Sequence, residues 1–206
     1  MSLHLLEDIA AQFVVRGDDL EERYLVSGVG WDEYEAVLER LGDSPWYRLT
    51  YLEGVLEIVA PSRRHEFNKD SITRLLNVYF EETRTRFYGL GSTTFRSKLK
   101  QRGLEPDTSF CIGSEKELPD IAIEVVETSG GIDKLEVYRG LRVPEVWFWQ
   151  KNQFNLFYLR SDVYEQVTRS QLLPDLDLDL LATYIPHPEP LDAVLEYRAR
   201  LRTQMS

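Results

Sequence analysis

The sequence predicts one α/β domain in which helices flank a mixed β-sheet. Segments with the apolar period of a helix are interspersed with short β-rich segments. A length of 206 residues, 43% of them hydrophobic, suits a single core. No internal repeat divides the chain. We expect an N-terminal extension at residues 1–29, the main domain at 30–186 and a C-terminal helix at 187–206.

The first half of the chain predicts strands and helices in alternation. Apolar side chains at helical spacing predict a helix at residues 31–41, and Ser62 is a good cap for a long helix at 63–86. Glu53-Gly54 predicts the turn of a hairpin. The expected strands are residues 21–27, 46–52, 55–59 and 96–102.

The second half continues in the same way. Apolar runs predict strands at residues 107–112, 121–126, 145–149, 155–160 and 164–168, and helices are expected at 132–141 and 191–200. Together these segments fit one mixed sheet.

Composition excludes several classes of protein. No apolar run reaches the ~18 residues of a membrane span, and residues 1–20 lack the pattern of a signal peptide, so we expect a cytoplasmic protein. The only cysteine, Cys111, lies in an apolar stretch that favours a core position. The three histidines are too scattered for a zinc motif.

The net charge of −11 is unevenly distributed. Residues 60–103 hold ten Lys or Arg and four Asp or Glu, so this segment carries about +6 and the remainder −17. A concentrated basic segment can present a surface to phosphates even in an acidic protein, although an uneven scatter without function is the alternative.

Glu124 lies in the middle of an otherwise apolar strand, Ile121-Ala122-Ile123-Glu124-Val125-Val126. An ionised carboxylate there costs several kcal/mol unless it is paired or binds a metal. The sequence therefore requires a partner for Glu124, which is either a functional group or a structural salt bridge.

A carboxylate that shares a cation with Glu124 must lie within a few ångströms of it. Asp120 is four residues earlier on the same strand, about 13 Å away at ~3.3 Å per residue. Asp107 begins the preceding strand and lies beside Glu124 if the two strands are neighbours. Asp107 and Glu124 are thus the candidate ligands of Mg²⁺ or Mn²⁺, which favour oxygen ligands and leave positions for a phosphate.

Lys134, ten residues after Glu124, is the candidate cation for a transition state. It lies in the first turn of a predicted helix, where a lysine does not favour the helix dipole. An ordinary solvated lysine is the alternative interpretation.

The long helix contributes two further candidates at its start. His65 lies on the apolar face and Glu66 about 100° round the helix from it. A structural, hydrogen-bonded histidine is the commoner explanation, but His65 or Glu66 would also complete a site.

Basic residues along the chain are candidates for phosphate contact. If residues 96–102 form a strand, four cations share one face, although a charged edge strand that prevents aggregation has the same pattern. The candidate nucleic-acid contacts are Arg63, Arg64, Arg96, Lys98, Lys100 and Arg102.

Several of these motifs together resemble the Uma-type restriction endonuclease family, a branch of the PD-(D/E)XK nuclease superfamily. The resemblance covers residues from about 30 to 185. It is carried by residues 47–58, Pro61-Ser62, His65-Glu66, 90–94, 105–107, 123–125, 133–135 and 143–147.

The resemblance implies a restriction-endonuclease-like core, a metal held by Asp107 and Glu124, and help from a helical acid such as Glu66. The superfamily's lysine usually lies two residues after the acid; Val126 occupies that place, so Lys134 is implied as a displaced lysine. The expected activity is Mg²⁺-dependent hydrolysis of DNA by a homodimer. The alternatives are a catalytically silent nuclease fold that binds nucleic acid or a protein, and a structural dimer.

Overall fold

The predicted fold class is confirmed, but the strands form two sheets rather than one. The computed structural model describes residues 21–41, 46–128 and 130–205. Sheet A is antiparallel throughout and has the spatial order β1 (Glu22–Ser27), β3 (Val55–Ala60), β2 (Arg48–Leu52), β6 (Arg102–Leu104) and β5 (Phe95–Ser97).

Sheet B is mixed, because β8 pairs in parallel with β9 and every other pair is antiparallel. Its spatial order is β11 (Val163–Val167), β10 (Gln153–Arg160), β9 (Glu145–Gln150), β8 (Ile121–Val125), β7 (Thr108–Ile112) and β4 (Phe87–Gly89). The strands predicted in this region are therefore present, and β4 is an addition that the sequence did not indicate.

The chain passes from sheet A to sheet B at Pro106. Glu105 still donates its N–H to the Leu49 carbonyl of sheet A, whereas Thr108 already pairs with Ile123 of sheet B. A proline has no N–H for a strand ladder, so pairing stops there. This local interruption is the physical reason why the expectation of one sheet was wrong.

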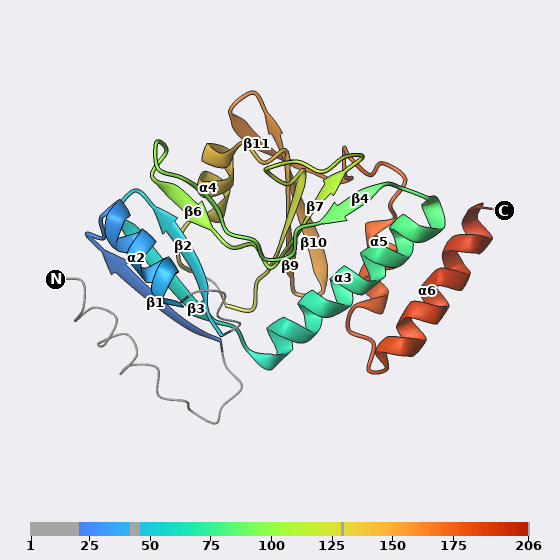
Figure 1. Ribbon diagram of the computed structural model, residues 1–206. Coiled ribbons are helices and arrows are strands. Elements are labelled where there is room, and N and C mark those ends of the chain that lie inside the picture. Colours follow the sequence, from blue (N-terminus) through green and yellow to red (C-terminus); the bar gives the residue numbers. More distant parts are fainter. Residues whose placement is uncertain (1–20, 42–45, 129, 206) are drawn as a thin grey trace.

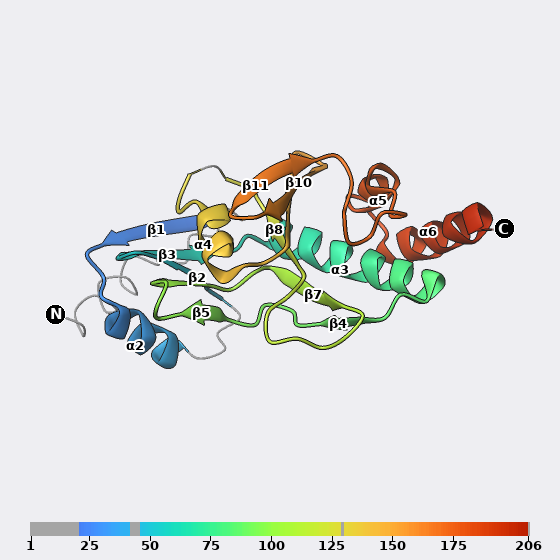
Figure 2. The ribbon, with the colours of Figure 1, turned by 90° about the horizontal axis from the view of Figure 1, so that it is seen from above.

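The helices pack around the two sheets (Figures 1 and 2). Helix α2 packs on sheet A, α4 lies where the two sheets meet, α3 and α5 pack on sheet B, and α6 packs against α3 and α5. Their bounds are α2 (Trp31–Leu41), α3 (Arg63–Thr83), α4 (Lys134–Leu141), α5 (Leu178–Tyr184) and α6 (Pro190–Met205). No helix among these is long and apolar enough to cross a membrane.

Two helices show how local sequence sets their ends. Ser62 caps α3 as predicted, because its side chain accepts a hydrogen bond from the His65 N–H. The helix ends three residues before the predicted position, since Arg84 adopts the left-handed conformation, with φ of 54°. Helix α2 has the predicted bounds and buries its apolar stripe.

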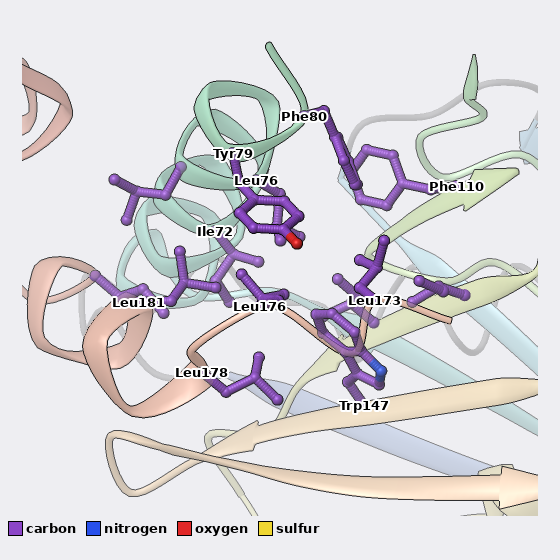
Figure 3. Close-up of a cluster of buried hydrophobic side chains, with 14 of the residues drawn as sticks. Ile72, Leu76, Tyr79, Phe80, Phe110, Trp147, Leu173, Leu176, Leu178 and Leu181 are labelled. Carbon is purple, nitrogen blue, oxygen red and sulfur yellow. The ribbon is translucent and has the colours of Figure 1, made fainter. Parts of the chain in front are cut away.

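The largest core cluster fills the space between α3, α5, α6 and one face of sheet B (Figure 3). Trp147 and Phe110 project from the sheet toward Ile72, Leu76 and other apolar residues of α3. A second cluster joins α2 to sheet A, and a third joins α4 to β5, β6, β8 and β9. Cys111 is fully buried, as its apolar setting predicts.

The prediction of a strand at residues 96–102 was wrong. Residues 98–101 form the turn of a β5–β6 hairpin, with successive bonds from Lys100 N–H to the Ser97 carbonyl and from Gln101 N–H to the Lys98 carbonyl. Gln101 has a positive φ of 50°. A seven-residue alternation is too short to distinguish a strand from a tight hairpin, so the four cations do not share one face.

Gly103 of β6 is expected to tolerate no side chain. A Cβ there would overlap the hydroxyl of Tyr34, which is fully buried and stacked on Tyr51 with ring centroids 4.7 Å apart. We expect Gly103→Ala to lower the free energy of unfolding by about 2 kcal/mol, measured by urea denaturation. Gly89→Ala is the control, because its Cβ would meet Phe110 at an ordinary 3.8 Å. Equal losses in the two variants would contradict this account.

Candidate active site

Asp107 and Glu124 lie side by side on neighbouring strands of sheet B. Strands β7 and β8 are antiparallel, and Thr108 is opposite Ile123. Continuing the same register by one residue on each strand places Asp107 opposite Glu124. Both carboxylates are buried, with 4% and 0% exposure. The predicted adjacency of the two strands is confirmed.

Asp107 is held by two donors. Its Oδ1 lies 2.8 Å from His65 Nε2, and its Oδ2 accepts the N–H of Val125 at 2.7 Å. Burial opposes its charge, but the His65 ring, Lys134 and the Val125 N–H outweigh burial and lower the pKa of Asp107 to about 2. Asp107 is therefore a carboxylate over the whole physiological range.

His65 bridges two carboxylates from the first turn of α3. Its Nδ1 lies 3.2 Å from Glu21 and its Nε2 contacts Asp107. Burial opposes protonation of the ring, but the two carboxylates raise the pKa of His65 to about 9. His65 is buried and hydrogen-bonded, as its position on the helix predicts, and it also contacts a candidate site residue.

Glu124 is engaged at both oxygens. Lys134 Nζ lies 2.5 Å from Oε2, and the Tyr138 hydroxyl donates to Oε1. Burial raises the pKa of Glu124, and the Lys134 charge counteracts that rise. The partner that the apolar strand requires is thus a lysine and a tyrosine from α4.

Helix α4 presents Lys134 and Tyr138 on one face, since they are four residues apart. The helix begins at Lys134, two residues later than predicted, because the Asp133 side chain accepts the Leu135 N–H as its cap. Burial opposes the lysine charge, but Glu124, Asp107 and Glu57 raise the pKa of Lys134.

Sequence reasoning missed Glu57, a third buried carboxylate, which comes from β3 of sheet A. Its Oε2 accepts from Arg23 at 3.2 Å and from the Ile132 N–H at 3.0 Å. Its Oε1 has no hydrogen-bond partner within the described part of the chain. The signal was available, because Glu57 interrupts the apolar strand Val55–Ala60 just as Glu124 interrupts β8.

Glu66 does not join the two acids. It is 40% exposed, and its ion pairs are with Lys69 of the same helix and with Arg48 at 3.6 Å. His65, rather than Glu66, is the residue that α3 places against Asp107. Asp120, excluded by distance, accepts the Ile112 N–H at the opposite end of β8.

The six candidate nucleic-acid contacts are dispersed. Lys98 pairs with Asp32 at 2.9 Å in the hairpin turn, and the Arg102 side chain turns inward to Glu53 and the Glu136 carbonyl. Arg96 and Lys100 are exposed on the same hairpin. Arg63 and Arg64 are exposed at the start of α3, next to His65 of the site.

Asp107 and Glu124 are the neighbouring buried carboxylates that could hold a magnesium ion. In residues 21–41, 46–128 and 130–205, no group of three or more Asp, Glu, His or Cys side chains is arranged to hold a metal. Magnesium commonly binds proteins through only one or two carboxylates, with water and phosphate as its other ligands. Each carboxylate oxygen has two lone pairs, so the hydrogen bonds present leave acceptor capacity for a cation.

One comparison with known proteins identifies a family. The family model Uma2, described as "Putative restriction endonuclease", matches residues 31–184, a range that includes Asp107, Glu124 and Lys134. A search of curated proteins finds no match. The mixed α+β architecture, with its sheets flanked by helices, is consistent with a restriction-endonuclease-like fold. The chain belongs to the Uma2 family, and through it to the PD-(D/E)XK-like nuclease superfamily.

Proposed function

We propose that the protein is a Mg²⁺-dependent endonuclease that hydrolyses phosphodiester bonds of DNA, and that residues 30–186 carry this activity. One observation supports the proposal most strongly: Asp107 and Glu124 are buried on adjacent strands, and Lys134 lies 2.5 Å from Glu124. Two acids and a cation at one place are the groups that phosphate hydrolysis requires.

Asp107 and Glu124 would hold the metal ion. When bound, Mg²⁺ supplies a Lewis acid for a phosphate oxygen and increases the acidity of a bound water. His65 and the Val125 N–H fix the Asp107 carboxylate, while Tyr138 fixes that of Glu124. These hydrogen bonds orient the two acids before any substrate arrives.

Lys134 is proposed to stabilise the charge that develops on the phosphate. In hydrolysis, the oxygen of water forms a bond to phosphorus as the bond to the leaving oxygen breaks, and negative charge builds on the oxygens around phosphorus. An ammonium group in a partly buried site stabilises that charge more than one in water does. The Lys134 side chain is 20% exposed, so a phosphate in solvent can reach it.

The substrate side of the proposal involves Arg64 and a second subunit. Arg64 is exposed at the start of α3 and is suited to contact the DNA backbone near the acids. Cleavage of both strands of a duplex needs two sites, and a homodimer would supply them.

We expect purified protein to nick supercoiled plasmid with Mg²⁺ or Mn²⁺ and to lose activity with a chelator. Asp107→Asn and Glu124→Gln should show no cleavage above the chelator background, and Lys134→Met should lower the rate about 10²–10³-fold. The measurement is the initial rate of nicking on agarose gels.

Asp120→Asn is the matched control, because Asp120 is an acid that directly precedes β8 and accepts the Ile112 N–H at the end of the strand away from Glu124. It should retain the wild-type rate. Cleavage that persists in Glu124→Gln would disprove the site. DNA binding without cleavage would instead favour a catalytically silent nuclease fold. In that case the contacts of Lys134 and Tyr138 with Glu124 have only a structural role.

A further inference from the structure

A pocket of about 490 Å³ opens next to Lys134, between the N-terminus of α4 and the outer part of sheet B. Its volume lies in the range of small-molecule sites. Lys134 itself is part of the wall, together with Phe148, Gln150, Asn155, Phe157 and Gln166. A ligand in this pocket is therefore adjacent to the candidate active site.

The register of sheet B explains why the pocket and Glu124 share a face. Glu124 is opposite Phe148 in the β8–β9 pair, and Phe148 is opposite Asn155 in the β9–β10 pair. Directly opposed residues of paired strands project to the same side of a sheet. A row of side chains thus leads from the catalytic acid across the sheet, and Phe157 and Gln166 extend it through the β10–β11 pair.

The pocket wall is aromatic and amide in character. The rings of Phe148 and Phe157 meet edge to face, with centroids 5.7 Å apart. Gln150, Asn155 and Gln166 line the same pocket, and within the described chain none of these three side chains makes a hydrogen bond. Unpaired amides offer both donors and acceptors, which match the edge of a neutral heterocycle rather than a phosphate.

A second, smaller depression of about 220 Å³ shares Val126 and Gln150 with this pocket. Arg64 and Lys151 are also in its wall. Arg23 and Lys134 line the larger pocket together with Asp133, and Arg64 and Lys151 line the smaller one together with Glu127. Cations in both walls, with amides in the larger pocket, suit a nucleic-acid strand whose phosphates contact the cations and whose base enters that pocket.

We propose that this pocket binds one unpaired nucleobase of the substrate strand, which stacks on Phe157 and bonds to the amides of Asn155 and Gln166. The inference rests on the proposed nuclease function and adds a preference for single-stranded or locally unpaired DNA. A paired base is excluded because its hydrogen-bonding edge is already used, and opening a pair costs a few kcal/mol.

Binding is measured in the presence of a chelator, so that base recognition is separated from cleavage. Two fluorescent DNA single strands of ten nucleotides serve as probes. One carries bases, and the other consists of abasic deoxyribose phosphates with the same charge. Base stacking contributes ~1–3 kcal/mol per base, so we expect the wild type to bind the base-bearing strand about tenfold more tightly. A fully paired hairpin should bind more weakly than the same hairpin with one unpaired base.

Asn155→Leu, Phe157→Leu and Gln166→Leu should each reduce affinity for the base-bearing strand several-fold and leave abasic binding unchanged. Gln166 is exposed on β11, so its replacement also tests the pocket if the other variants fold poorly. Gln153→Leu is the matched control, since Gln153 is an exposed amide of β10 outside the pocket wall.

Equal binding of base-bearing and abasic strands by the wild type would overturn the inference, as would equal effects of Gln153→Leu and Asn155→Leu. Failure of the nuclease proposal is distinguishable from this outcome. In that case the protein does not nick plasmid with metal, but the binding differences measured in chelator persist.

Discussion

Replacing Lys134 with methionine is expected to destabilise the metal-free protein by about 3 kcal/mol. The variant keeps the length and apolar stem of the side chain but leaves Glu124, which is fully buried, with Tyr138 as its remaining partner. Removal of one member of a buried ion pair is costly because the other charge stays desolvated. The measurement is urea denaturation in chelator.

A double-mutant cycle with Glu124→Gln isolates the pair. Because the neutral amide no longer needs a cation, Lys134→Met should cost much less in that background, with a coupling of about 0.5–3 kcal/mol. Lys69→Met is the matched control: Lys69 pairs with Glu66, which is 40% exposed, and such pairs contribute about 1 kcal/mol or less. A loss no larger than that of Lys69→Met would refute a buried ion pair at Glu124.

The stability that His65 contributes is expected to disappear as pH rises. The pKa of His65 is raised from 6.5 to about 9 in the folded protein by Asp107 and Glu21, against the effect of burial. Its contribution is therefore complete below pH 6.5 and is lost as pH rises through 9. This change in the pKa of His65 corresponds to about 3 kcal/mol of folding stability.

The experiment compares free energies of unfolding at pH 6 and pH 9.5, in chelator, for wild type and His65→Gln. Wild type should lose about 3 kcal/mol more than the variant over this interval. His187→Gln, at a histidine near the start of α6 whose Nδ1 contacts the Glu189 backbone carbonyl rather than a carboxylate, should retain the wild-type dependence. Parallel pH profiles for wild type and His65→Gln would contradict a charged His65. On the acid side, contacts with His65 outweigh burial and help to lower the pKa of Asp107 from 3.8, and that of Glu21 from 4.5, to about 2, so their contribution is lost as pH falls from about 4 through 2.

Local patterns predicted much of the fold and part of the site. The apolar spacing of residues 31–41 gave the bounds of α2, and the cost of a carboxylate in an apolar strand identified Glu124. The same cost applies to Glu57, which interrupts the apolar strand β3. Asp107 followed from strand spacing, because only a neighbouring strand can place a second acid near Glu124.

Other features depend on pairs of residues that are distant in the sequence. The contact of His65 with Glu21 joins α3 to residues just before β1, and that of Glu57 with Ile132 joins sheet A to the start of α4. The basic residues 96–102 alternate like a strand, yet tertiary pairing makes them a hairpin and turns Arg102 toward Glu136.

The sequence by itself determined that Glu124 needs a partner, that Ser62 begins a helix and that the chain forms an α/β domain. The first two depend on interactions within one element, which a few consecutive residues specify, and the third follows from the order of such elements along the chain. Only the tertiary structure decided that the strands form two sheets, that Lys134 and Tyr138 are the partners of Glu124, and that the same face continues into a pocket lined by Asn155 and Phe157. These outcomes depend on which strands pair and in what register, and pairing is a property of the whole chain.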